Sequence, residues 1–167
     1  GRRTWQETRV PLFKLAVDGR NRDSRDLHLP PRVHFGTGWV RQGAYELFAA
    51  AVHLHEALLP ICSRENALAR LRAQRTPALG ELRLHHGTLW PWNRPVYDPA
   101  DGGHLRIELR ALPAGPSAAD MMANAAFALG LARGLRDRID DWLPGIPFAI
   151  AESNFYRAAE HGLDATL

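Results

Sequence analysis

Apolar residues recur at three- and four-residue steps over residues 42–59, the spacing that lines up side chains on one face of an α-helix. Two further helices are predicted from their start and stop signals. One covers residues 63–75 and begins at Ser63, a residue type favoured at helix N-caps. The other covers residues 148–161 and ends before Gly162, a typical helix terminator.

The longest predicted helix covers residues 117–139. Ser117, with Asp120 three positions later, matches a capping box at its start. Residues 121–132 are apolar on nearly all sides and rich in Ala and Gly. This composition is typical of a buried helix that packs closely against a sheet. We therefore expect this helix to cover one face of the strands described next.

Polar and apolar residues alternate over residues 81–85 and 104–111, the two-residue period of a half-buried strand. Residues 91–103 contain three Pro, two Gly and two Asp and are predicted as the loop between them. Residues 7–31 are also predicted as loop, and residues 32–35 as a short extended piece. The chain is thus predicted to be α+β: an antiparallel sheet with helices packed on one face and the other face open.

Composition limits the function classes. The 167 residues fit one domain, residues 1–167, and the apolar stretch from Leu47 is interrupted by His53 and His55, so we expect no membrane span. The single Cys62 excludes an internal disulfide and favours a cytoplasmic protein. The formal net charge is only +3 and the cations are dispersed, so we expect no nucleic-acid partner.

The strand at residues 104–111 turns four ionisable side chains to one side: His104, Arg106, Glu108 and Arg110. The predicted strand at 81–85 does the same with Glu81, Arg83 and His85, and alternation favours His85 over His86 as the residue on the charged side. Two interpretations stay open: a solvated face with ion pairs, or a ligand-binding surface. Asn124, among apolar residues, needs a hydrogen-bond partner that is either structural or functional.

Residues 88–136 carry a resemblance to a known family. The stretch LRIELRALPAGPSAADMMANAAFALGLARGL resembles the signature of the glutamine synthetase and glutamate-cysteine ligase superfamily, and TLWPWNRPVYD is similar to the segment before it in bacterial carboxylate-amine ligases. PLFKLAVD and NFYRAAEHGLDA are similar to the family in a weaker way. The ordered residues that carry the resemblance are Trp90, Asn93, Arg94, Arg106, Glu108, Arg110 and Asn124.

The resemblance implies a partial glutamine synthetase-like catalytic domain and an ATP- and Mg²⁺-dependent ligase, as in glutathione biosynthesis. Such an enzyme phosphorylates the side-chain carboxylate of glutamate or a related amino acid, and an amine such as cysteine displaces the phosphate. Glu108 would be a Mg²⁺ ligand, and Arg94 and Arg110 would hold the phosphoryl group or the carboxylate. Arg106, Asn124 and His85 would line the substrate or nucleotide site, with an ion pair as the alternative role for Arg106.

One departure from the family bears on activity. No Gly-x-Glu-x-Glu strand with acidic metal ligands occurs before residue 80, so we expect the chain to be the carboxyl-terminal half of a larger ligase and inactive alone. The alternative is a noncatalytic scaffold or binding domain derived from that fold. Glutamine synthetase proper is disfavoured because Asn124, Ala125 and Ala126 stand where Asn-Pro-Tyr is expected. Self-association to a homo-oligomer through an uncovered sheet edge is a further expectation.

Overall fold

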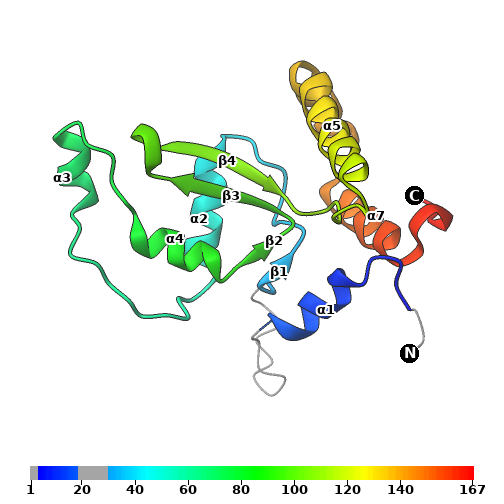
Figure 1. Cartoon of the computed structure of the whole chain (residues 1–167), viewed down its shortest axis with the longest axis horizontal. Coiled ribbons are helices and arrows are strands. Elements are labelled where there is room, and N and C mark those ends of the chain that lie inside the picture. The colour runs from blue at the N-terminus through cyan, green and yellow to red at the C-terminus, as the bar shows by residue number, and fades with distance from the viewer. Residues whose placement is uncertain (1–3, 19–29) are drawn as a thin grey trace.

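The computed structural model describes residues 4–18 and 30–167 (Figure 1). Helices and short strands are mixed along the chain, and single turns of 3₁₀-helix occur in four places of this part. The elements are α1 (Arg9–Ala16), β1 (Val33–His34), α2 (Ala44–Leu54), α3 (Ala67–Arg72), α4 (Gly80–Gly87), β2 (Trp90–Pro91), β3 (Asn93–Asp98), β4 (His104–Leu109), α5 (Ala118–Leu135), α6 (Ile139–Trp142) and α7 (Phe148–His161).

The strands form two small sheets. β3 and β4 pair antiparallel, with Arg94 opposite Glu108 and Val96 opposite Arg106. β1 and β2 pair in parallel, with Val33 opposite Trp90. The α+β class and the antiparallel pairing of the strand at β4 are therefore confirmed, as is the extended piece at 32–35, which contains β1.

The core lies where α1, the β1–β2 sheet and α7 meet. Val10, Val33, Trp92 and Ala159 are buried there, and Trp92 is only 1% exposed. The Phe155 ring lies 5.6 Å from that of Trp92 between ring centroids. Aromatic rings dominate this core, so most of its stabilisation comes from burying large apolar surfaces. The residue that links β2 to β3 is thus anchored at the centre of the core.

Several predicted helices are confirmed with changed ends. α7 ends before Gly162, and Ser117 and Asp120 form a capping box at the start of α5. The predicted helix at 42–59 is shorter, since α2 ends at Leu54. The predicted helix at 63–75 begins later, because the side chain of Asn66, instead of Ser63, accepts the Ala69 amide at 2.9 Å and caps α3.

Two strand and loop predictions are wrong. Residues 81–85 belong to helix α4, in which Leu82 and His86 lie one turn apart and face β3. Five alternating residues are too few to exclude a helix, and tertiary burial decides. The proline-rich segment predicted as loop contains β3, where Pro95 is tolerated because β3 has a free edge in its two-stranded sheet.

The predicted amino-terminal loop at 7–31 is also wrong in part, because α1 occupies Arg9–Ala16. Residues 19–29 of that predicted loop lie outside the described residues. The first apolar residue of α1, Val10, is buried in the core, and Phe13 packs on Trp90 with 4.2 Å between ring centroids. Val10 and Phe13, about one helical turn apart, therefore hold α1 against the β1–β2 sheet.

The packing of helices on the sheet differs from the prediction. None of the residues of α5 is buried, and Figure 1 shows this helix extending away from both sheets. Leu105, Ile107 and Leu109, the apolar side of β4, are about half-exposed. α2 and α4 instead lie along β3 (Figure 1). Within the described residues, no helix is both long and apolar enough to cross a bilayer.

Candidate functional site

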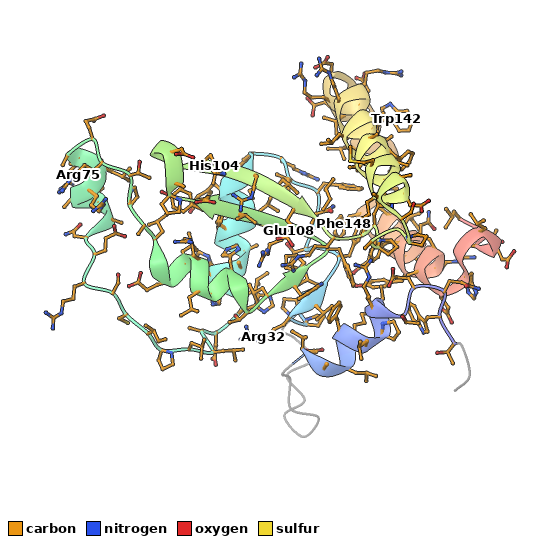
Figure 2. All side chains as sticks on the ribbon, viewed as in Figure 1. Arg32, Arg75, His104, Glu108, Trp142 and Phe148 are labelled. Carbon is orange, nitrogen blue, oxygen red and sulfur yellow. The ribbon has the colours of Figure 1, made fainter. Side chains whose placement is uncertain are left out.

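The side chain of Glu108 lies between two of the predicted arginines. Arg94 is directly opposite Glu108 in the β3–β4 register, and opposite residues of an antiparallel pair project to the same face. The Arg94 Nε donates to the Glu108 Oε2 at 3.0 Å, and the Arg110 Nε donates to Oε1 at 2.9 Å. Figure 2 labels Glu108 at the carboxyl end of β4 and His104 at its start. The structure thus brings Arg94, Glu108 and Arg110 together.

Arg110 is held in place from several sides. Its guanidinium carbon lies 4.2 Å from the centroid of the Trp90 ring, and its backbone amide donates to the Trp92 carbonyl at 2.9 Å. Its carbonyl accepts from the Arg9 Nη1 at 3.3 Å. The side chain is only 9% exposed, and its Nη1 has no hydrogen-bond partner among the described residues. Arg110 is therefore firmly positioned, and its unpaired Nη1 is itself buried.

The two guanidinium groups control the ionisation of Glu108. Burial by itself raises the pKa of Glu108, but the hydrogen bonds from Arg110 and Arg94 outweigh it and hold the pKa below its usual value. The carboxylate is therefore ionised at neutral pH and neutralises one of the two arginines. The cluster keeps a net charge of +1, which favours an anion over a cation nearby.

The same face carries a hollow of about 170 Å³. It is lined by Arg83 and His86 of α4 and by Arg94 and Arg106 of the sheet, and we call it the arginine hollow. The apolar side chains of Phe48 and Leu82 also line it. Arg83 was expected on the charged face as part of a strand; it reaches that face from a helix instead. Asp98 also lines the hollow and pairs with Arg106, and Glu108 pairs with Arg94. The three guanidinium groups still leave a net positive charge there, which suits a phosphate or carboxylate ligand.

Arg106 takes part in an ion pair at the other end of β4. Its Nη1 donates to the Asp98 Oδ2 at 3.1 Å and lies 2.8 Å from the His104 Nε2. The Ala100 amide and then Arg106 hold the pKa of the Asp98 carboxyl below its usual value. Arg106 therefore forms the ion pair that was its alternative role. Its half-exposed side chain also lines the arginine hollow.

His85 lies away from this face. Its Nε2 is 2.9 Å from the Ala51 carbonyl of α2, so the alternation argument that favoured His85 over His86 was wrong. His86, which that argument placed on the packed side, is 7% exposed and lines the arginine hollow beside Arg94. Helical spacing from Leu82 is the signal that would have found it. Burial, followed by the charges of His85 and Arg94, lowers the pKa of His86 to about 4.

Asn124 has a structural partner. Its Nδ2 donates to the Pro113 carbonyl at 3.2 Å, which ties α5 to the turn before it. The side-chain amide of Asn124 thus has the hydrogen-bond partner that its apolar neighbours led us to expect. A ligand contact for Asn124 stays a prediction.

The donor set around Glu108 does not fit Mg²⁺. Both carboxylate oxygens already accept hydrogen bonds from guanidinium groups, and a divalent cation would meet two positive neighbours. Among the described residues, no three potential His, Cys, Asp or Glu ligands lie together as a metal site. Metal ligation by Glu108 stays a prediction, and the guanidinium groups beside it present donors of the kind that bind anions. Comparisons of the chain with family models, with curated proteins and with solved structures found no match.

Proposed function

We propose that the chain carries the anion-binding strand pair of an ATP-dependent carboxylate-amine ligase of the glutamate-cysteine ligase type. The observation that supports this most is the arrangement of Arg94 and Arg110 on either side of Glu108, next to the arginine hollow. Positioned positive charge is what a phosphoryl transfer to a carboxylate requires, because negative charge accumulates on the phosphate and carboxylate oxygens.

In the proposed reaction, a glutamate side-chain oxygen attacks the γ-phosphorus of ATP, and the bond from that phosphorus to the bridging oxygen breaks to release ADP. The amine nitrogen of the second substrate then attacks the acyl carbon. The carbon–oxygen bond to phosphate breaks, inorganic phosphate leaves, and the amine loses a proton. Arg94 and Arg83 would bind the phosphoryl and carboxylate oxygens, while Glu108 would hold Arg94 and Arg110 in their orientation.

Mg²⁺ would neutralise the nucleotide phosphates in such a ligase. Because both oxygens of Glu108 are engaged by arginines, the proposal needs metal ligands other than those of the described residues. We therefore keep the expectation that the chain alone does not catalyse ligation.

A noncatalytic binding domain is the second candidate. The observation in its favour is that Glu108 is fully engaged in ion pairs, as in a structural cluster. Such a domain would bind a phosphate or carboxylate group at the arginine hollow without transferring it.

Calorimetry with inorganic pyrophosphate tests anion binding. Arg83 is the variant of choice, since no ion pair of its side chain is found among the described residues and its loss does not disturb Glu108. We expect Arg83→Gln to weaken pyrophosphate binding at least fivefold. The matched control is Arg136→Gln, on a side chain that is 78% exposed and remote from the hollow, and it should bind as the unaltered chain does.

Turnover separates the two candidates. Glutamate-dependent release of ADP from MgATP by the complete gene product, lost in Glu108→Gln, would support the ligase. Pyrophosphate binding without such release would favour the binding domain. Absence of pyrophosphate and MgATP binding at millimolar concentrations would refute both.

A further inference from the structure

A second and larger hollow lies between α2, the β1–β2 sheet and the segment from α6 to α7. Its volume is about 310 Å³. Its walls are mainly apolar and include Phe35, Trp39, Leu47, Ile139, Leu143 and Phe148. Three histidines, His34, His55 and His86, also line it, and we call it the histidine cavity. It shares only His86 and Pro95 with the arginine hollow.

The aromatic walls of the histidine cavity are held in place by contacts between distant segments. The Trp39 Nε1 donates to the Ile146 carbonyl at 2.8 Å, and the Trp39 and Phe148 rings meet edge to face with 5.3 Å between centroids. Gly36, with φ +152°, allows this approach, because a Cβ there would lie 3.1 Å from the Phe148 ring. The carboxyl-terminal segment thus closes one side of the cavity over the β1 region.

Two ring nitrogens of the cavity histidines are buried without a hydrogen-bond partner in the described part of the chain. They are the His34 Nδ1 and the His86 Nε2. His86 is 7% exposed and His55 is 9% exposed. A buried polar atom left unpaired loses its hydrogen bond to water without compensation, so native structures usually supply a partner. Both nitrogens are shielded from water as the rings stand, so a bound molecule would supply a partner here after a rotation of the imidazole ring.

The described lining of the cavity carries no formal charge. Among the residues that the structure describes, no Asp, Glu, Lys or Arg lines it. Burial, with a smaller effect from His55, lowers the pKa of His34 to about 4, and burial also lowers the pKa of His86 to about 4. Both imidazoles are therefore neutral at pH 7 and can each donate one hydrogen bond and accept one. A charged ligand would be desolvated here without a countercharge.

We propose that the histidine cavity binds an uncharged aromatic small molecule whose single N–H or O–H group hydrogen-bonds to the His34 or His86 imidazole. The volume supports the size class: an engineered apolar cavity of about 150 Å³ in another protein binds benzene, so roughly twice that volume accommodates a two-ring compound. The Trp39 and Phe148 rings offer the faces and edges on which such a ring packs. This site is independent of the proposed ligase function, since its ligand is neutral and contacts no arginine.

Indole and indene are the probes, because they share one shape and only indole carries an N–H group. Titrations of the full chain are followed by saturation-transfer NMR at pH 7. We expect saturable binding of both probes, with indole bound at least fivefold more tightly than indene. Absence of saturable indole binding up to its solubility limit would overturn the proposal.

Two Val→Trp variants locate the binding. Val40 lines the cavity from a partly exposed loop, so Val40→Trp fills the space without placing a bulky residue in the core. Val52 lies on the exposed face of α2, outside the cavity lining, and Val52→Trp is the matched control. We expect Val40→Trp to weaken indole binding at least tenfold and Val52→Trp to change it less than twofold. Equal effects of both variants would contradict the assignment to this cavity.

Two His→Phe variants test the hydrogen bond. The His86 ring already packs against Phe48 in a tilted arrangement, with 4.8 Å between ring centroids, so a Phe ring is compatible with its place. We expect His34→Phe or His86→Phe to reduce the preference for indole over indene to less than twofold while indene still binds. If both variants keep the full preference, the proposed role of the imidazoles is wrong. If Val40→Trp fails to fold, the ratio of indole to indene affinity in the two His→Phe variants still tests the proposal.

Discussion

Acid is expected to destabilise the protein between pH 7 and pH 5 through His34 and His86. Both have a pKa of about 4 in the folded chain, against an ordinary value of about 6.5 in the unfolded chain. In this window the unfolded chain therefore takes up protons that the folded chain does not. Linkage then requires stability to be complete above about pH 6.5 and to fall as the pH approaches 4.

The magnitude follows from the two pKa values. For one histidine with values of about 6.5 and 4, lowering the pH from 7 to 5 removes about 2 kcal/mol of unfolding free energy. Two such histidines together remove about 2–4 kcal/mol of unfolding free energy over this pH range. The range extends below the full sum because neither group is fully shielded from water. Protonated His34 would place a positive charge beside His55. Protonated His86 would place one beside Arg94, which is charged, and beside His85. Since small domains have about 5–15 kcal/mol of stability in total, the loss is large.

Urea denaturation followed by tryptophan fluorescence at pH 7, 6 and 5 measures this effect. We expect the unfolding free energy to fall across the series with an unchanged m-value. His34→Phe and His86→Phe should each remove about half of the fall. His53→Gln is the control, since His53 is exposed on α2, and it should keep the original slope. The reasoning is refuted if the double Phe variant loses as much stability between pH 7 and pH 5 as the unaltered chain.

Three further substitutions test the packing, a cap and a strained backbone position. Trp92→Ala should lower the unfolding free energy by about 3–5 kcal/mol in urea titrations, because it empties the centre of the core; a loss below about 1 kcal/mol would contradict this. Ser117→Ala removes the capping box of α5 and should lower the unfolding free energy by about 1 kcal/mol. Because the Asp120 amide loses its bond to the Ser117 Oγ, hydrogen exchange at Asp120 should quicken severalfold while exchange in α7 is unaffected. Exposed Gln74 has φ +55°, a left-handed conformation that Gly adopts without strain, so Gln74→Gly should stabilise the fold by about 0.5–1 kcal/mol and raise the melting temperature. A lower melting temperature would refute this.

Local patterns in the sequence were sufficient for the features that depend on neighbouring residues. Ser117 and Asp120 predicted the start of α5, and Gly162 predicted the end of α7. The alternation of Glu108 and Arg110 with apolar residues placed both side chains on one side of β4. These features were predictable because capping and strand periodicity act over a few residues, and a short stretch of sequence contains all the information they need.

The tertiary structure decided which segments lie against one another. Residues 81–85 fold as a helix because half-buried Leu82 and buried His86 face β3, and the proline-rich segment becomes a strand because β4 pairs with it. The apolar α5 stays exposed, and His34, His55 and His86 meet at one cavity although the chain separates them widely. Burial and long-range pairing depend on residues far apart in the chain, so a short pattern is compatible with several arrangements until the whole chain packs.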